Sequence, residues 1–394
     1  MADNNPTSAP EPFVFRHSAR QILFGPGKLS ELATIAKARN VSRAVVVMDG
    51  FFIGGPLEAH IREVLKDLID LKIYGVPIQE PDTETVEACR RVLEQRQPDM
   101  IVAVGGGSTM DTAKVARILL SNIGTVEEMA GFERYYEPHE SVMVCVPTTA
   151  GTASEVSEMA VIGLKGSDIK LRYRSQNMTA QFAVLDPELL ISAPPSVTAN
   201  TGYDALTHAI EAYISRGANI MSDPYALEAI RRLVKWLPVA YRDGENLTAR
   251  GHTHIGSMLA GVAFNSTQLG LTHAIAAPLG NIHHVVHGKA NALALPAVIA
   301  YNEPELGEKG QFLVDILGSE SAAEGVARIR ADLDLDIGLD EIVTTDEERE
   351  IIVEAAMKSG NVPYSPREPS VEHIWAIIAA MRQPIGASRP VLEI

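Results

Sequence analysis

Apolar residues in the first half of the chain come in short, β-branched runs. Each run is followed by a glycine- or proline-bearing turn and then by a segment with helical periodicity. The predicted strands are residues 44–48, 71–76, 100–104, 141–146 and 181–185, and the predicted helices are residues 56–68, 83–94 and 109–120. Strands that are apolar along their whole length and alternate with helices indicate a parallel sheet covered on both faces.

The pattern changes near Pro194-Pro195, because helical periodicity dominates beyond it. The predicted helices there are residues 205–214, 224–237, 248–264, 322–333, 346–358 and 371–381, and the predicted surface loops are residues 307–311 and 362–368. We therefore expect a disordered lead over residues 1–12, an α/β domain with a parallel sheet over residues 13–194, and an all-helical domain over residues 195–394.

Charge and composition exclude several classes of protein. The chain has 50 acidic against 34 basic residues and a net charge of -16, so it lacks the basic surface that nucleic acids require. Its longest apolar stretch, Ala292–Tyr301, is shorter than the ~18 residues of a membrane span, and the N-terminal residues do not resemble a signal peptide. Cys89 and Cys145 are expected to be buried thiols, and the location is expected to be cytoplasmic.

A glycine-rich turn follows the third predicted strand and opens a helix. Gly105, Gly106 and Gly107 precede Ser108 and Asp111, which are spaced like a capping box. Free backbone N–H groups and the helix dipole make such a turn an anion site that suits a pyrophosphate. We therefore expect the α/β domain that contains this turn to bind a dinucleotide. The motif differs from GxGxxG because methionine occupies the third glycine position, and an ordinary tight turn is the alternative.

Two further features lie at the carboxyl ends of predicted strands. The loop around Thr148, Thr149 and Thr152 is rich in hydroxyl groups, which suits a ligand but also an ordinary Ser/Thr turn. Asp49 follows the first predicted strand, where a carboxylate can accept both hydroxyls of an adenosine ribose and repel a 2′-phosphate. This favours NAD over NADP, although a lone aspartate after a strand is also a common turn former.

Histidines and one aspartate in the second half form a candidate metal site. Asp204 and His208 are four residues apart and share one helical face. His273 and His287 are separated by Pro278-Leu279-Gly280, which we expect to interrupt the helix and bring the two imidazoles together. One carboxylate and three imidazoles suit Fe²⁺ or Zn²⁺ with a position open to substrate, although any single histidine is more simply a core or surface residue.

Four segments of the chain resemble the iron-containing (group III) alcohol dehydrogenases. The segments are Gly105 to Lys114 (GGGSTMDTAK), Pro147 to Val156 (PTTAGTASEV), Asp204 to Tyr213 (DALTHAIEAY) and His273 to Asn291 (HAIAAPLGNIHHVVHGKAN). The resemblance implies a nucleotide-binding domain, a helical metal-binding catalytic domain and an active site in the cleft between them. It also implies a homodimer.

The resemblance assigns roles to individual residues. The implied metal ligands are Asp204, His208, His273 and His287, with Fe²⁺ or Zn²⁺ as the metal. The implied NAD(H) contacts are Asp49, Gly106, Gly107, Ser108, Thr148, Thr149, Thr152 and Lys170, and Gly105 and Asp111 belong to the same glycine-rich motif.

Some positions depart from the family pattern. Ala277 stands where a second histidine is common, which puts the usual proton path in doubt, and we expect His283 and His284 either to replace that relay or to be surface imidazoles. Ala153, Glu80 and Val286 replace residues that are commonly glycine, asparagine and proline.

These features predict a metal-dependent, NAD(H)-linked alcohol dehydrogenase or aldehyde reductase that acts on a small primary alcohol or aldehyde. The cationic segment Lys170–Arg174 would select a substrate with an acidic group, unless it is a solvated turn in which Lys170 serves the cofactor. The alternatives are a hydroxyacid-oxoacid transhydrogenase, a lyase of the dehydroquinate synthase type, a metallohydrolase and a non-catalytic binding protein.

Overall fold

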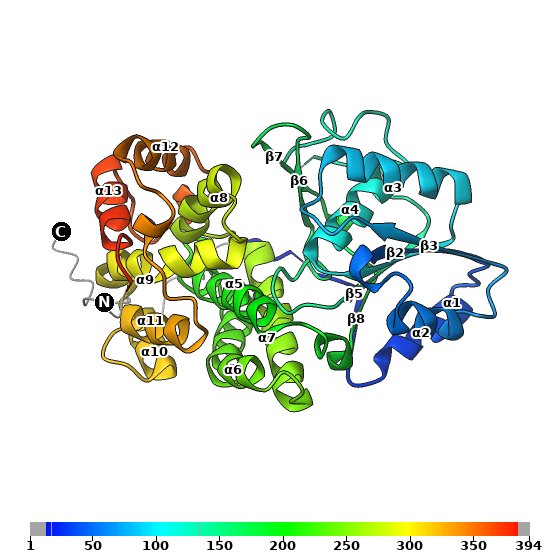
Figure 1. The fold of residues 1–394 in the computed structure, drawn as a ribbon, viewed down its shortest axis with the longest axis horizontal. Coiled ribbons are helices and arrows are strands. Elements are labelled where there is room, and N and C mark those ends of the chain that lie inside the picture. Colours follow the sequence, from blue (N-terminus) through cyan, green and yellow to red (C-terminus); the bar gives the residue numbers. More distant parts are fainter. Residues whose placement is uncertain (1–12, 17, 133, 385–394) are drawn as a thin grey trace, which may run out of the picture.

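A sheet domain and a helical domain lie beside each other along the long axis of the molecule (Figure 1). The computed structural model describes residues 13–384 except residues 17 and 133, so the predicted disordered lead lies outside the described residues. The expected fold class, an α/β N-terminal region with a parallel sheet followed by a helical C-terminal region, is confirmed.

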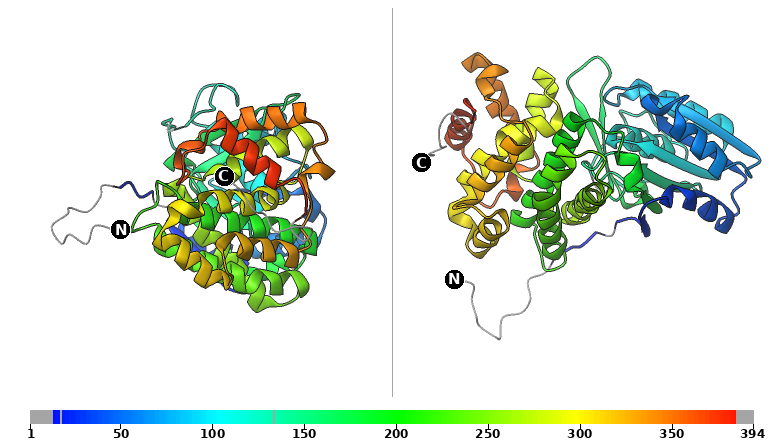
Figure 2. Two further views of the ribbon diagram at one scale, coloured as in Figure 1. Left: turned by 90° about the vertical axis from the view of Figure 1, so that its left-hand side faces the viewer. Right: turned by 60° about the horizontal axis from the view of Figure 1, so that its bottom comes forward.

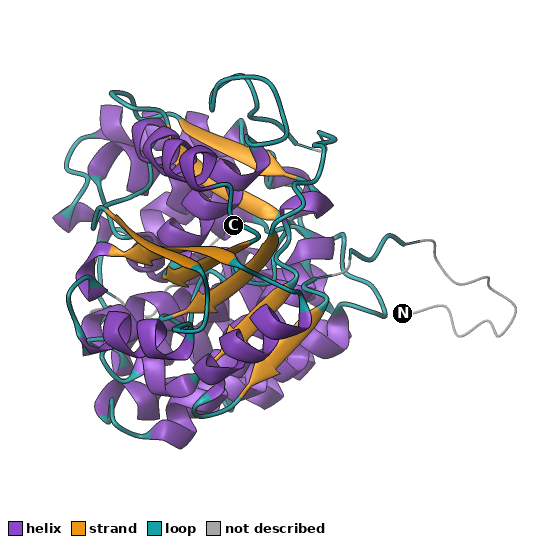
Figure 3. Cartoon of the chain, turned by 90° about the vertical axis from the view of Figure 1, so that its right-hand side faces the viewer, coloured by secondary structure: helices purple, strands orange, loops and turns teal. Residues whose placement is uncertain are grey.

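Six parallel strands form the main sheet in the order β1-β8-β5-β4-β2-β3. Figure 3 shows the strands in orange among the surrounding helices. Their bounds are β1 Gln21–Phe24, β2 Arg43–Asp49, β3 Asp70–Val76, β4 Met100–Gly105, β5 Val142–Pro147 and β8 Phe182–Leu185. Alternate residues of β2 enter two separate cores, with Val45 and Val47 on one face and Val46 and Met48 on the other. Both faces of the sheet are therefore buried, which explains the continuous apolar runs in the sequence.

Two pairs of helices cover the sheet. The helices are α1 Glu31–Ala38, α2 Pro56–Val64, α3 Thr83–Arg96 and α4 Gly107–Ile118. Leu32 of α1 and Ile61 of α2 enter the core that contains Val46, whereas Val86 of α3 and Met110 of α4 enter the core that contains Val47. The pairs thus lie on opposite faces (Figure 1).

An antiparallel hairpin, which the sequence analysis did not predict, lies on the side of the sheet domain that faces the helical domain (Figure 1). It consists of β6 Met159–Gly163 and β7 Lys170–Arg174. Ala160, Ile162 and Tyr173 anchor one of its faces in the core under α3 and α4.

The second half of the chain is a packed array of helices (Figure 2). They are α5 Pro195–Ile214, α6 Asp223–Arg242, α7 Leu247–Thr267, α8 Leu271–His283, α9 His287–Leu306, α10 Glu308–Leu317, α11 Ala322–Asp332, α12 Asp346–Met357 and α13 Val371–Ala380. None of the described helices is long and apolar enough to span a membrane. Cys89 and Cys145 are free and buried, as expected.

Two expectations for this half were wrong. The segment 307–311 is not a loop, because Gly307 alone makes the turn with φ +52° and α10 begins at Glu308. The helix is not interrupted at Pro278 either, since α8 continues through it to His283. The chain instead turns at His284, whose φ of 54° is left-handed, before α9 begins at His287.

Candidate active site

Two loops meet at the carboxyl edge of the sheet, one after β4 and one after β5. Gly105 of β4 is opposite Pro147 of β5, and the backbone N–H of Thr148 donates to the carbonyl of Gly105 at 3.0 Å. A methyl group added to Gly107 would lie 2.6 Å from Cγ2 of Thr152, so this position is too crowded for a side chain. The glycine loop, residues 105–107, and the threonine loop, residues 148–155, therefore form one continuous backbone surface at the start of α4.

The expected capping box is absent from this helix start. The N-cap of α4 is Gly106, which has no side-chain cap. Asp111 instead accepts hydrogen bonds from Oγ of Ser154 at 2.6 Å and from the backbone N–H of Val161 at 2.9 Å. The Asp111 carboxylate is thus directed at the threonine loop and the hairpin, away from the helix start.

A buried lysine, which was quoted at the end of a motif but not predicted as a site residue, supports the same loop. Nζ of Lys114 donates to the carbonyls of Ser154 at 3.0 Å, Ser157 at 3.1 Å and Met159 at 2.5 Å. Lys114 lies on α4 and its side chain is fully buried, so these carbonyls and the Asp111 carboxylate at 3.8 Å compensate its charge. The signal that could have found it is a lysine among the apolar positions of a predicted helix.

Glu155 of the threonine loop is also buried. Burial raises the pKa of its carboxyl from the ordinary value of 4.5 to about 7. The folded state therefore binds a proton more tightly than the unfolded state, and this contribution to stability is present below the unfolded pKa and lost as pH rises to the folded one.

We expect Glu155→Gln to stabilise the protein more at pH 8 than at pH 5. The difference between variant and wild type in the free energy of unfolding should grow by about 3 kcal/mol across that range, because the amide avoids the cost of ionising a buried carboxyl. Urea denaturation at the two pH values measures it. Glu320→Gln, at an exposed position, is the control, and parallel pH profiles for wild type and Glu155→Gln would contradict the assignment.

Asp49 lies at the end of β2, two strands from β5 in the sheet order. Its Oδ1 accepts a hydrogen bond from the backbone N–H of Phe51 at 3.0 Å. Phe51 and Phe52 line an adjoining cavity of about 470 Å³, together with Leu57 and Leu189. His60, Asp186 and Glu188 also line this cavity, and Asp49 is connected to it through Phe51.

The predicted metal ligands come together between α5, α8 and α9. Ligand atoms of Asp204, His208 and His273 all lie within 4.8 Å of one another, and His287 approaches this group through Asp204. Oδ1 of Asp204 lies 3.5 Å from Nε2 of His208. The same oxygen lies 3.7 Å from Nε2 of His273 and 3.6 Å from Nε2 of His287. Asp204, His208 and His273 are nearly fully buried, whereas the side chain of His287 is 47% exposed, so the cluster reaches the surface on the His287 side.

The donor set fits a divalent cation. Nδ2 of Asn291 donates to Oδ1 of Asp204 at 2.7 Å and also lies 3.3 Å from Nε2 of His273 and 3.4 Å from Nε2 of His287. A carboxylate oxygen and two imidazole nitrogens thus surround the electropositive end of an amide, and the Asn291 carbonyl oxygen is buried without a partner. Burial lowers the pKa of His208 to about 4, which keeps its ring neutral and able to bind a metal.

Glu211, which was quoted within a motif but not predicted as a site residue, orients one of the four ligands. Its carboxylate accepts from Nδ1 of His273 at 2.6 Å and from the backbone N–H groups of Gly270 at 3.0 Å and Thr272 at 2.6 Å. Nε2 of His273 is therefore the nitrogen that faces Asp204. The spacing from Asp204 through His208 to Glu211 follows one helical face and could have revealed this residue.

Burial alone would lower the pKa of His273, but hydrogen bonds to Asp204 and Glu211 outweigh burial and raise the pKa to about 9. Burial likewise opposes ionisation of Asp204, yet the charges of the surrounding imidazoles hold its pKa below the ordinary value. The cluster is thus strongly coupled, and metal binding must displace a proton from it.

The remaining predicted residues lie around this centre. His283 ends α8, and His284 makes the left-handed turn that follows. Within the described residues, neither ring makes a hydrogen bond to the four ligands, so their relay role stays a prediction. Lys170 lies on β7 and pairs with Glu80.

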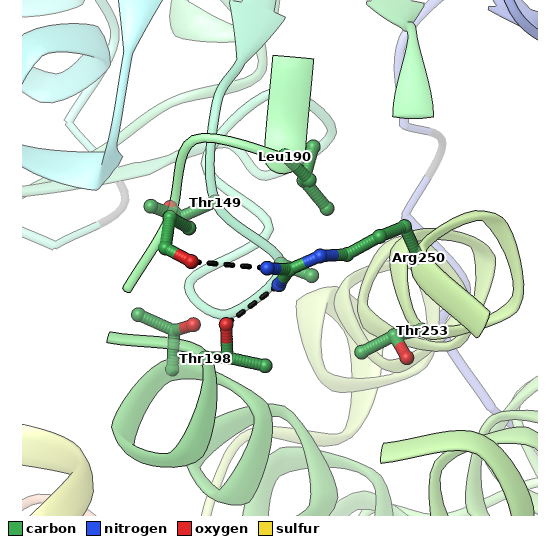
Figure 4. A pocket seen from close by; sticks show the side chains of 8 residues that line it. Thr149, Leu190, Thr198, Arg250 and Thr253 are labelled. Atoms are coloured by element: carbon green, nitrogen blue, oxygen red, sulfur yellow. Dashed lines mark hydrogen bonds between the residues drawn. The ribbon is translucent and has the colours of Figure 1, made fainter. Parts of the chain in front are cut away.

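A small cavity behind Thr149 is closed by Arg250 of α7 (Figure 4). Its Nη1 donates to Oγ1 of Thr198 at 2.6 Å and its Nη2 to the carbonyl of Ala193 at 3.0 Å. With a volume of about 10 Å³ the cavity has no room for a substrate. Arg250 therefore connects α7 to the start of α5 and to the loop that precedes it.

Comparison with known proteins matches both halves of the chain. Residues 19–187 match the model of "Iron-containing alcohol dehydrogenase", and residues 198–382 match that of "Fe-containing alcohol dehydrogenase family, C-terminal". The NAD-dependent methanol dehydrogenase of Bacillus methanolicus is 30% identical over 90% of this chain and 96% of its own length. The 1,3-propanediol dehydrogenase of Citrobacter freundii is 33% identical over 90% and 95%.

Solved structures agree over nearly the whole chain. A 1,3-propanediol oxidoreductase superposes with a TM-score of 0.90 at 31% identity, covering 94% of this chain and 100% of its own. The sulfoacetaldehyde reductase of Bifidobacterium kashiwanohense, solved in complex with NAD+, superposes with a TM-score of 0.89 at 26% identity, covering 94% and 99%.

Proposed function

The chain belongs to the iron-containing alcohol dehydrogenase family, and we propose that it interconverts a small primary alcohol and its aldehyde using NAD(H) and one divalent metal ion. The observation that carries this proposal is the convergence of one carboxylate and three imidazoles on a single point. The ligands would be Asp204, His208, His273 and His287, whose polar atoms lie within 3.7 Å of Oδ1 of Asp204. Fe²⁺ is the metal we propose, and Zn²⁺ fits the same donors.

When bound, the metal supplies Lewis acidity toward the substrate oxygen, and the nicotinamide supplies or accepts the hydride. The protein's own residues bind and orient these groups. Glu211 would fix the tautomer of His273, and the exposed side of His287 would leave an approach to the metal open. The continuous backbone surface at Gly106, Gly107 and the threonine loop would hold the pyrophosphate at the start of α4.

The adenosine end of the cofactor would lie at Asp49. The carboxylate would accept the ribose hydroxyls, and the cavity beside Phe51 and Phe52 would receive the base. A 2′-phosphate would meet the negative charge of Asp49, so we propose NAD(H) in preference to NADP(H).

The test is bound metal per chain and aldehyde-dependent oxidation of NADH, after reconstitution with iron or zinc under anaerobic conditions. Wild type should hold about one ion and consume NADH in proportion to aldehyde, whereas His287→Ala should lose most of both. Asp332→Asn, at an exposed position, is the control. Retention of NADH with no net oxidation would instead favour a lyase, and a requirement for a second carbonyl substrate would favour a transhydrogenase.

A further inference from the structure

Three cations of β7 share the face of the hairpin that points away from the core. Side chains alternate along a strand, so Lys170, Arg172 and Arg174 lie on one face. The opposite face is fixed by Tyr173, which is buried, and by Leu171, which packs against the same core. Arg174 on this face contacts Asn265 of α7, so this is the face of the hairpin that meets the helical domain.

Carboxylates neutralise the two outer cations. Arg174 is buried, and its Nε donates to Oε1 of Glu158 at 2.7 Å. Nζ of Lys170 pairs with a carboxylate oxygen of Glu80, in the loop between β3 and α3. The backbone N–H of Gly163 donates to the carbonyl of Pro81 at 2.8 Å, so the loop that carries Glu80 is held against the hairpin. The backbone thus keeps Glu80 beside Lys170.

Arg172 has no such partner. Within the described residues its guanidinium makes no ion pair or hydrogen bond, although the side chain is partly buried. Burial lowers the pKa of this guanidinium, and its five N–H donors require acceptors. The buried Arg117 and Arg250 also lack a carboxylate, but they donate to carbonyl and hydroxyl oxygens. A partly buried arginine with neither kind of acceptor among the described residues is open to a ligand.

The contacts of Arg174, two residues further along the same face, place Arg172 near the metal ligands. Nη2 of Arg174 donates to the carbonyl of Asn265 at 3.1 Å. The preceding residue, Phe264, has its ring centroid 4.7 Å from that of His208. The face of β7 that carries Arg172 therefore lies on the His208 side of the cluster.

We propose that Arg172 binds an acidic group of the substrate, so that the preferred substrate is a small aldehyde or alcohol carrying a carboxylate, sulfonate or phosphonate. The planar guanidinium binds two oxygens of such a group at once. Because Glu80 and Glu158 hold the two outer cations, Arg172 is the one cation of this face left to recognise the acid. The inference rests on the proposed function, since it names the substrate class of the same site.

The experiment compares 4-oxobutanoate with butanal, which have equal carbon chains and differ in the acid, as substrates for the metal-loaded enzyme with NADH. We expect wild type to prefer the acid, and Arg172→Met to lower kcat/KM for 4-oxobutanoate by roughly 10- to 100-fold while butanal changes less than about threefold. Arg172→Lys should retain part of the preference. Lys165→Met is the matched control, because Lys165 lies at the hairpin turn and pairs with Asp82 and Glu84 outside this face.

A second measurement separates this inference from the proposed function. The dissociation constant of butanoate, measured by calorimetry on the same metal-loaded protein, should rise by the same factor in Arg172→Met even if neither aldehyde is turned over. If Arg172→Met lowered kcat/KM equally for both aldehydes and weakened NADH binding, Arg172 would bind an anionic group of the cofactor, and the proposal would be overturned. So would a wild type without preference for the acid, or unchanged butanoate binding in the variant.

Discussion

Replacing Glu211 with glutamine is expected to raise the dissociation constant for the divalent metal by roughly 10- to 100-fold. Glu211 is an acceptor for three N–H donors, including Nδ1 of His273. An amide has one acceptor oxygen and two donors, so it leaves at least one of these N–H groups unpaired and removes the charge that makes His273 a better ligand. The measurement is a competitive metal titration against a chelator of known affinity.

Glu211→Asp should lose less metal affinity than Glu211→Gln, because aspartate keeps the negative charge although its side chain is shorter. The control is Glu228→Gln, which removes only an ion pair on the surface of α6. Excess metal should restore aldehyde-dependent NADH oxidation in Glu211→Gln if the residue acts through His273. A glutamine variant with wild-type metal affinity would show that the carboxylate is merely structural.

Replacing Gly288 with alanine is expected to disable the site through the backbone. A methyl group at this position would overlap the carbonyl oxygen of Asn200 on α5, and backbone atoms cannot rotate away as a side chain can. The start of α9 would have to move, and with it the adjacent His287. We expect a loss of roughly 2–4 kcal/mol in the free energy of unfolding and at least a 100-fold weaker metal affinity, by analogy with the loss of ligand orientation.

The matched control is Gly360→Ala, since an added methyl group there meets no atom within 4 Å. Chemical denaturation and the same metal titration measure both effects. If Gly288→Ala bound metal as tightly as wild type, the contact with Asn200 would have no part in placing His287.

Much of the fold could be predicted because its signals are local. The continuous apolar runs of β2, β4 and β5 follow from burial on both faces of a parallel sheet. The strand β1 was missed because it has four residues at the sheet edge and a mostly half-exposed pattern. The course of α8 was mispredicted because proline costs a helix only one hydrogen bond and a steric adjustment, and the buried residues on both sides of Pro278 outweigh that cost.

The site, like the fold, could be predicted only where its signals are local. The spacing of Asp204 and His208 placed them on one helical face, whereas the approach of His273 and His287 depends on a turn whose position the sequence did not reveal. Glu211, Asn291 and Lys114 were missed because their importance lies in what they contact. The carbonyls around Lys114, for example, come from a loop some forty residues further along the chain, as its separation of 40 from Ser154 shows.

The turn at His284–Val286 joins two helices that each contribute one histidine, while α5 contributes the aspartate and the other histidine. A bound ion would therefore act as a cross-link among three helices and oppose local opening of this turn. When the metal is scarce, the turn should open more often and become a preferred site of proteolytic attack. The abundance of the enzyme in the cell would then follow the supply of its metal, without any dedicated regulator.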